Sequence, residues 1–287
     1  MPELPEVQTV VSELNQKLVN KKIVTVEVLT PKIISIGPAT VSNRRKTTAA
    51  QVQKFILLLQ GQKVRSVTRR AKMLIFSFEK PLSMLVHLKM TGQFIFEDKA
   101  QRQKTKGMYR ILNKPTAPLV KFPTKHTHVV FKFVDGSTLY FSDVRKFGYL
   151  KIVHDNELNQ VREFTEYGPE PLSPEFTFAK FVASIGNRKA VSIKQFLMDP
   201  KVVVGIGNIY SDEILFHATV RPDRRVSKLS KIELKKIYEQ IRPVLKQAIK
   251  YKGSSVGDFV RTDGAWGTMG KHHFVYGRYK EQCKVCE

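Results

Sequence analysis

Apolar side chains recur at three- and four-residue intervals over residues 2 to 19, which predicts a helix with one buried face. The positions that repeat in this way are Leu4, Val7, Val10, Val11, Leu14 and Leu18. Pro2 and Pro5 fall in or beside the first turn, where a missing backbone N–H costs little. We therefore expect the chain to open with an amphipathic helix.

From Ile23 to about Val153 the pattern changes to short alternating or β-branched runs, which predict strands. The clearest runs span residues 23–29, 64–70, 73–78, 83–90, 128–134 and 137–144. Asp135-Gly136 lies between the last two runs and is a strong hairpin signal. Residues 98–124 interrupt the pattern with many lysines, arginines and prolines, so we expect a basic surface loop there.

Helical periodicity returns after the turn-rich stretch 167–175. It includes a face near Phe178 and Phe181 and a long amphipathic stretch from Leu229 to Ile249. From Gly253 onward the sequence is glycine-rich and irregular. We predict an α+β protein with three parts, whose boundaries are residues 1–155, 156–252 and 253–287.

Charge is the anomaly in an otherwise ordinary composition. The 287 residues include 49 Lys or Arg against 25 Asp or Glu, a formal net charge of +24. Such an excess indicates a polyanionic partner, either nucleic acid or anionic lipid, with a merely basic or ribosomal protein as the alternative. Because there are only two cysteines, no apolar run of membrane-spanning length and no secretory signal, we expect a soluble intracellular protein.

The most suggestive chemistry lies at the N-terminus. Removal of Met1 would leave Pro2 with a free secondary amine, and an α-amine is less basic than a lysine side chain (about 7.7–8.0 against about 10.4). Such an amine can attack an electrophilic carbon and form an iminium, and the neighbouring Glu3 can transfer protons. Glu6 lies one helical turn further on the same side. Taken alone, Pro-Glu at a helix start is more simply helix-opening chemistry.

Ordered motifs from residue 2 to residue 286 resemble those of the formamidopyrimidine-DNA glycosylase family, bacterial enzymes that excise oxidised purines. They are PELPEV (2–7), RRAK (69–72), HLKMTG (87–92), KHTHV (125–129), DVRKFG (143–148), GPEPL (168–172), the stretch 188–216 with its GIGNIY, and VYGR (275–278) before C-K-V-C. Any one motif alone is weak evidence for the family, but eight motifs in the family's order are strong evidence. The resemblance implies a β-sandwich domain with an N-terminal helix, a helix-two-turns-helix domain and the start of a zinc finger.

The resemblance also implies a bifunctional mechanism for base excision repair. Pro2 would attack the deoxyribose anomeric carbon as the damaged base departs, and Glu3 would be the general acid/base. Lys72, the motif lysine of RRAK, would contact phosphate and help elimination. The iminium makes the adjacent sugar proton acidic, so strand cleavage by β-elimination follows.

Further positions match the family's DNA contacts. Met90, Arg145 and Phe147 match residues that fill the gap left by an extruded base. The remaining matches are His126, Lys189, Lys194 and Asn208. Asn208 follows the glycines of GIG, where backbone N–H groups can approach a phosphate at a helix start. Individually, each of these side chains is more simply a core residue or a solvated surface group.

The C-terminus departs from the family pattern. A Cys₄ zinc site needs two C-x-x-C pairs, and here the sequence supplies Cys283 and Cys286 and stops at Glu287. We therefore expect a truncated gene product or a degraded site, with half a Zn²⁺ site and no arginine assigned to the second, δ-elimination. His272 and His273 are alternative ligands. Smaller departures are Lys89 and Ala71, which replace glycines usual in their motifs.

Two other functions stay open at this point. One is the endonuclease VIII-like branch, which removes oxidised pyrimidines, although PELPE and the pair Arg145 and Phe147 favour the purine branch. The other is a non-catalytic module that binds damaged DNA. In each case the expected partner is damaged double-stranded DNA, with no membrane and no organic cofactor, and we expect a monomer in the bacterial cytoplasm, associated with the nucleoid.

Overall fold

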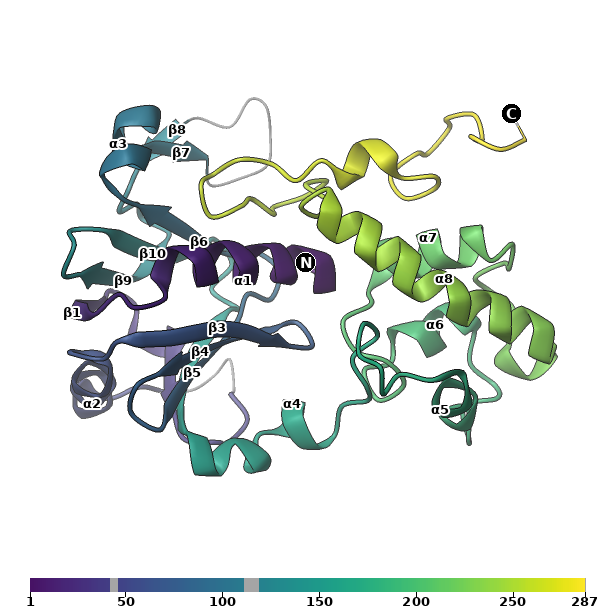
Figure 1. The fold of residues 1–287 in the computed structure, drawn as a ribbon, viewed down its shortest axis with the longest axis horizontal. Helices are drawn as coiled ribbons and strands as arrows, with labels where there is room; N and C mark the ends of the chain where they lie inside the picture. The colour runs from purple at the N-terminus through teal and green to yellow at the C-terminus, as the bar shows by residue number, and fades with distance from the viewer. Residues whose placement is uncertain (42–45, 111–118, 287) are drawn as a thin grey trace.

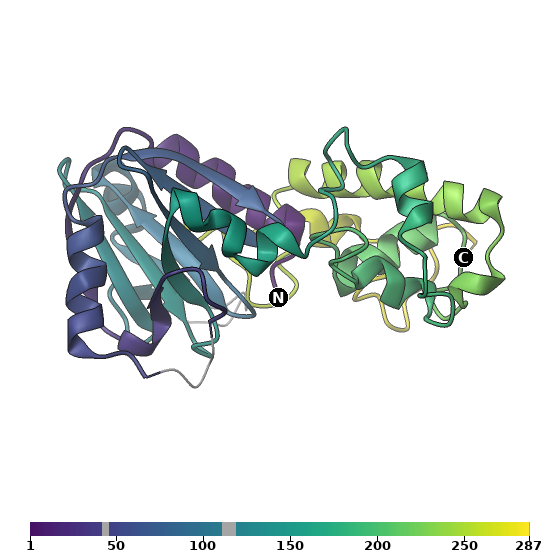
Figure 2. The same cartoon turned by 90° about the horizontal axis from the view of Figure 1, so that it is seen from below.

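The computed structural model describes residues 1–41, 46–110 and 119–286, which form a β-rich lobe and a helical lobe (Figures 1 and 2). Residues 155–177 connect the two lobes, and they include η2 (Asp155–Gln160) and α4 (Arg162–Thr165). Within the described ranges, no helix has both the length and the apolar character needed to cross a bilayer. The α+β class expected from the sequence is confirmed.

Helix α1 (Leu4–Leu18) lies at the junction of the two lobes (Figure 1). Its start is fixed by Glu3, whose backbone N–H donates to Glu6 Oε2 at 2.8 Å. Leu4 packs in the core of the helical lobe, whereas the apolar positions from Val7 to Leu18 pack in the core of the β-rich lobe. The helix predicted over residues 2–19 is therefore confirmed, and its apolar face is shared between two cores.

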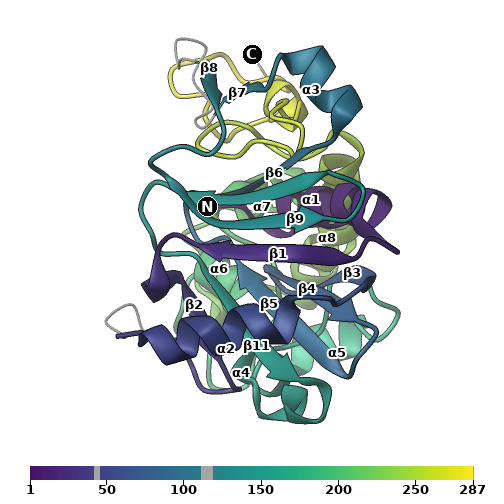
Figure 3. The same cartoon turned by 90° about the vertical axis from the view of Figure 1, so that its left-hand side faces the viewer.

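The described residues of the β-rich lobe form two large sheets and a third sheet of two short strands (Figure 3). The four-stranded sheet has the order β1 (Ile23–Val28), β9 (Thr127–Phe133), β10 (Thr138–Asp143) and β6 (Gly92–Glu97). The five-stranded sheet has the order β2 (Ile34–Ile36), β11 (Tyr149–His154), β5 (Leu82–His87), β4 (Met73–Phe78) and β3 (Val64–Arg70), with η1 (Pro31–Ile33) before β2. Phe76 of one sheet meets Phe94 of the other edge-to-face, at 5.6 Å between ring centroids, so the two sheets share one core. The predicted Asp135-Gly136 hairpin joins β9 to β10, and Gly136 has the positive φ of 81° that such a turn requires.

Two stretches of the β-rich lobe differ from the prediction. Residues Ala49–Leu59 form helix α2, which a purely β interpretation of 23–153 missed. The segment 98–124 is not a plain surface loop: it contains α3 (Lys99–Thr105), β7 (Met108–Arg110) and β8 (Leu119–Lys121). Tyr109 and Phe122 anchor it, because both rings are buried and pack edge-to-face at 5.7 Å. Residues 111–118 of the expected loop lie outside the described residues.

The helical lobe follows the predicted periodicity. Its elements are α5 (Phe178–Ala183), α6 (Ile193–Met198), α7 (Asn208–His217), η3 (Val226–Lys228), α8 (Lys231–Lys250) and η4 (Met269–His272). Thr177, Ser192 and Ser230 cap the starts of α5, α6 and α8 by accepting backbone N–H groups. Phe181 and Phe196 are buried in the apolar core of this lobe, with 5.6 Å between their ring centroids.

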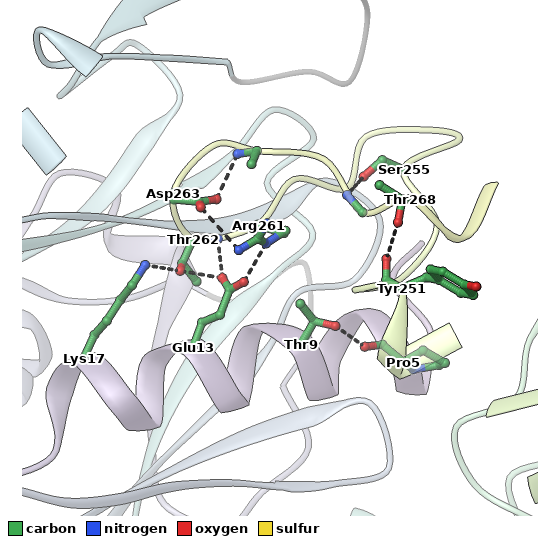
Figure 4. Close-up of polar contacts among 12 residues, drawn as sticks. Pro5, Thr9, Glu13, Lys17, Tyr251, Ser255, Arg261, Thr262, Asp263 and Thr268 are labelled. Atoms are coloured by element: carbon green, nitrogen blue, oxygen red, sulfur yellow. Dashed lines mark hydrogen bonds and ion pairs between the residues drawn. The ribbon is translucent and has the colours of Figure 1, made fainter. Parts of the chain in front are cut away.

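Residues 253–268, which we call the strap, return from the end of α8 to the β-rich lobe (Figure 4). A bridge between Ser254 and Thr268 closes the base of the strap. At its far end the carbonyl of Thr262 accepts the N–H of Phe96 in β6 at 2.8 Å. Phe259 is buried in the core between the two sheets. The strap is therefore a second connection between the lobes.

Candidate active site

The start of α1 lies against the start of α7. The Glu3 carboxylate accepts the N–H groups of Gly207 at 2.6 Å, Ile209 at 2.9 Å and Tyr210 at 3.4 Å. A Cβ on Gly207 would lie 2.5 Å from the Glu3 carboxylate, so a glycine is required for this approach. Three donors at this helix start thus bind Glu3, while the phosphate contact expected at Asn208 stays a prediction.

The environment of Glu3 favours the protonated form of its carboxyl group. The side chain is 3% exposed. Burial raises its pKa from an ordinary value near 4.5 to about 7; the Lys72 ammonium opposes the rise, and the Glu6 carboxylate adds to it. A carboxyl group with a pKa near neutrality can both release and accept a proton at physiological pH.

Glu6 holds the backbone around Glu3. In addition to the Glu3 N–H, its carboxylate accepts the Ser254 N–H at 2.7 Å and the hydroxyl of Tyr210. Ser254 Oγ in turn lies 2.7 Å from His273 Nε2. This network fixes the first residues of α1 against α7 and the base of the strap.

Lys72 lies in the tight turn between β3 and β4. Its ammonium donates to the carbonyl of Ile206 at 3.0 Å, and burial lowers its pKa, with partial compensation by Glu3 and Glu6. The turn is fixed to the other lobe by Glu170, which accepts Arg69 Nη1 at 2.6 Å and the Ala71 N–H at 2.6 Å. The motifs RRAK and GPEPL, about 100 residues apart, thus meet and place Lys72 beside Glu3.

A pocket of about 220 Å³ opens at this junction. Both lobes line it, with Met1, Ala71, Lys72, Met73, His87, Lys89, Glu163, Tyr167, Met198, Pro200, Gly205 and Ile206. Pro2 is buried and Met1, directly before it, lines the pocket. Removal of Met1 would therefore leave the Pro2 amine at the wall of a pocket that contains Lys72 and adjoins Glu3.

Two lining residues were not predicted from the sequence. His87 at the end of β5 accepts the Lys89 N–H through Nδ1 at 3.0 Å, and burial lowers its pKa to about 3, so it is neutral. Lys89 itself has a left-handed backbone, with φ of 52°. Ala71 has the same conformation, with φ of 55°. The two positions where glycine is usual in these motifs are thus positions that a glycine would occupy with less strain.

Met90, Arg145 and Phe147 lie together next to the pocket. Arg145 Nη1 lies 2.8 Å from Met90 Sδ, and its guanidinium carbon lies 4.6 Å from the centroid of the Phe147 ring. Met90 is 39% exposed and Phe147 is 37% exposed. Two loops, one before β6 and one after β10, bring these residues together; we call them the wedge loops.

Asp143 fixes both wedge loops and was missed in the sequence. It is fully buried, and its carboxylate accepts the N–H groups of Arg145 at 3.1 Å and Gly148 at 2.7 Å, together with the hydroxyl of Thr91. No local sequence signal identifies it, because an aspartate at the end of a strand is also an ordinary turn residue.

The other predicted DNA contacts are spread over the surface. His126 is half-buried before β9, where its carbonyl accepts the Asp143 N–H at 3.0 Å. Lys189 and Asn208 are exposed. Lys194 forms an ion pair with Asp212 at 2.8 Å. The structure therefore links His126 to the wedge loops, whereas the roles of all four in DNA binding stay predictions.

Cys283 and Cys286 do not complete a tetrahedral site with the predicted histidines. The His272 ring stacks on Tyr251 at 3.7 Å, and His273 is held by Ser254 and by the carbonyl of Tyr276 at 3.1 Å. Among the described residues, no three His, Cys, Asp or Glu side chains form a group that could hold a metal ion. The residues present thus fit half of a Cys₄ zinc site.

A larger cavity, of about 860 Å³, lies elsewhere. Its lining includes Lys194, Leu215, Val220, Cys283 and Cys286, and none of Pro2, Glu3 and Lys72. Its walls are mainly apolar, and its one lysine, Lys194, is held in the ion pair with Asp212. The smaller pocket between the lobes is therefore the candidate active site.

Two domain models match the sequence of the chain. The model of the formamidopyrimidine-DNA glycosylase N-terminal domain matches residues 1–150, and that of the formamidopyrimidine-DNA glycosylase H2TH domain matches residues 167–260. The formamidopyrimidine-DNA glycosylase of Shouchella clausii is 36% identical over 287 residues, which covers 100% of this chain and 92% of that protein. The protein of the same name from Listeria innocua is 34% identical over 286 residues, with the same coverage.

Solved structures show the same similarity. The Lactococcus lactis Fpg in complex with DNA containing an abasic site is 29% identical, with a TM-score of 0.78 over 99% of this chain and 91% of that chain. The wild-type Lactococcus lactis Fpg in complex with DNA containing N7-benzyl-Fapy-dG is 28% identical, with a TM-score of 0.79 and the same coverage.

Proposed function

The chain belongs to the formamidopyrimidine-DNA glycosylase family, and we propose on this premise that the Pro2 amine excises oxidised purines from damaged double-stranded DNA. It is a DNA glycosylase of base excision repair, with 8-oxoguanine and formamidopyrimidines as its substrates. The observation that carries the mechanism is the pocket between the lobes. Met1, the residue before Pro2, and Lys72 both line this pocket. It lies beside the buried Glu3, whose pKa is about 7.

The first step breaks the bond between base and sugar. The lone pair of the Pro2 nitrogen forms a bond to the anomeric carbon, and the glycosidic bond breaks with its electron pair leaving on the base. The nitrogen then loses its proton. Glu3 in its protonated form donates to the ring oxygen of the sugar as the ring opens, and the product is an iminium between Pro2 and the opened sugar.

The second step cleaves the strand. The positive iminium makes the proton on the neighbouring sugar carbon acidic; a base removes it, and the 3′ phosphate leaves by β-elimination. The Lys72 ammonium, oriented by the Ile206 carbonyl, is placed to stabilise phosphate charge. We restrict the proposal to β-elimination.

Opening of the duplex falls to the wedge loops. Met90 and Phe147 would replace the lost stacking, and the Arg145 guanidinium would bond the base left opposite. Asp143 holds the two loops in register for this insertion. His126, Lys189, Lys194 and Asn208 would add phosphate contacts, and together with the charge of +24 they predict a steep loss of affinity with salt.

Zinc is the metal of the family's C-terminal finger, and we assign it no catalytic step here. Cys283 and Cys286 would hold it as two of its ligands. We also propose domain boundaries at residues 155 and 252, a monomeric state, and a cytoplasmic location at the nucleoid.

Borohydride trapping on two duplexes tests the function. One duplex contains 8-oxoguanine and the other dihydrouracil, and reduction of the iminium fixes the protein to the DNA. We expect a covalent adduct with the 8-oxoguanine duplex. A preference for dihydrouracil would move the chain to the endonuclease VIII-like branch, and binding without an adduct on either duplex would identify a non-catalytic module.

A further inference from the structure

Lys89 occupies a position between the two parts of the site. It lines the pocket with Met1 and Lys72, and it directly precedes Met90 in the sequence. A side chain at this position is therefore next to the catalytic amine and to the wedge at the same time.

The backbone at Lys89 is strained for a lysine. Its φ of 52° lies in the left-handed region, which glycine adopts at little cost and lysine does not. The Lys89 N–H donates to His87 Nδ1 at 3.0 Å, and the N–H of a glycine would donate equally well. Stability alone thus favours glycine at this position.

The charges around Lys89 suit an anionic ligand. Its ammonium lies 5.7 Å from the centroid of the Tyr149 ring, and the Tyr149 hydroxyl donates to Glu163 at 3.1 Å. Among the ion pairs of the described residues, none includes Lys89. Burial lowers the pKa of Lys89, and Glu163 opposes the change. The pocket wall therefore presents two lysines, one glutamate and a neutral His87.

We propose that Lys89 is a substrate-binding residue whose ammonium contacts a backbone phosphate of the lesion strand beside the extruded nucleotide. The phosphate belongs to the lesion strand because the pocket that Lys89 lines is the one at which Pro2 must meet the sugar. The contact would hold the strand while Met90, the next residue, enters the base stack. The inference rests on the proposed function and extends it to the grip on the substrate.

Lys89→Gly and a matched control, Lys106→Gly, separate this role from a structural one. Lys106 ends α3 with φ of 53°, is exposed and does not line the pocket. Both variants lose one positive charge and one strained lysine backbone, so both should unfold at a temperature equal to or above that of the unchanged protein. They should differ only in how they bind DNA.

The expected result concerns affinity and salt. Lys89→Gly should weaken binding to an 8-oxoguanine duplex about 10-fold and raise KM with little change in kcat. In a plot of log affinity against log salt concentration, the slope for Lys89→Gly should be smaller in magnitude by about 0.9, the value for one lost phosphate contact. Lys106→Gly should stay within about twofold of the unchanged protein, and Lys89→Arg should restore affinity.

Equal effects of the two glycine variants, or an unchanged salt slope in Lys89→Gly, would overturn the proposal. The failure of the proposed function has a different signature, because the unchanged protein would then form no borohydride adduct. Binding and trapping are measured on the same duplex, so the two failures are distinguishable.

Discussion

Helix α1 carries buried carboxylates near both ends, and the molecule holds them in different ways. Glu13 in its second half accepts Arg261 Nε at 2.6 Å, and the N–H and hydroxyl of Thr262 at 3.0 and 2.7 Å (Figure 4). Lys17 donates to the same Thr262 hydroxyl at 2.8 Å. Glu13 thus has a guanidinium partner in direct contact and fastens the far end of the strap.

Glu3, at the start of the same helix, has only backbone donors in direct contact among the residues that the structure describes. The N–H groups of Gly207, Ile209 and Tyr210 bind it, while Lys72 donates to the carbonyl of Ile206. Burial without a paired cation keeps the pKa of Glu3 near 7. One helix thus fastens the two lobes with a paired carboxylate, and at its start holds an unpaired one whose raised pKa suits proton transfer.

The largest expected effect separates the two carboxylates by activity. Glu3→Gln should lower the single-turnover rate of 8-oxoguanine excision about 10²- to 10⁴-fold, because it removes the proton donor. Glu13→Gln keeps an acceptor for Thr262 and should leave the rate within about threefold, measured by quenched-flow cleavage at saturating enzyme. Equal losses of single-turnover rate in the two variants would contradict a catalytic role for Glu3 that Glu13 does not share.

The free energy of unfolding should distinguish the carboxylates in the opposite way, because here Glu13 is the important one. Glu13→Ala leaves Arg261 Nε and two Thr262 donors without their acceptor, so we expect the free energy of unfolding to fall by about 3 kcal/mol in urea denaturation. Glu27→Ala is the control: its partner Lys132 is 54% exposed, and that exposed ion pair should cost less than about 1 kcal/mol. A loss as small as the control's would mean that Glu13 does not fasten the strap.

A further difference is the pH dependence that the raised pKa of Glu3 gives to stability. Between pH 4.5 and about 7 the folded protein keeps a proton on Glu3 that the unfolded chain has released. The contribution of Glu3 to stability is therefore full below pH 4.5 and falls as pH rises to about 7, by at most about 1.4 kcal/mol per pH unit. Relative to Glu3→Gln, the unchanged protein should lose stability over this interval in urea titrations, and parallel curves for the two would contradict a raised pKa.

Local pattern is sufficient to predict much of the fold. The periodicity of α1, the strand runs and the Asp135-Gly136 turn each depend on neighbours in sequence, and each is predicted correctly. Helix α2 is missed by strand periodicity, although Thr48 and Gln51 form a capping box that signals a helix start. Segment 98–124 resembles a loop in sequence because its charge conceals the two aromatic anchors at Tyr109 and Phe122.

The site residues also differ in whether the sequence alone could predict them. Pro2 and Glu3 are predicted from their adjacent positions at the N-terminus. Lys72 and the residues of the wedge loops are predicted from the family motifs. Glu13 and Asp143 could not be predicted, because a carboxylate becomes a fastening point only when the fold brings donors to it, as with Thr262, 249 positions along the chain from Glu13. In the sequence Lys89 is only a departure from a motif, and its left-handed backbone is visible only in the structure.

The central claim is that the amine of Pro2 forms the covalent bond to DNA beside a Glu3 that transfers the proton. The most direct test is borohydride trapping on an 8-oxoguanine duplex, followed by digestion and mass spectrometry of the peptide that carries the sugar. The account predicts that the sugar is attached to the nitrogen of Pro2 in a peptide that lacks Met1, and that Pro2→Gly forms no adduct. A sugar attached to Lys72 or Lys89, or a peptide that retains Met1, would contradict it.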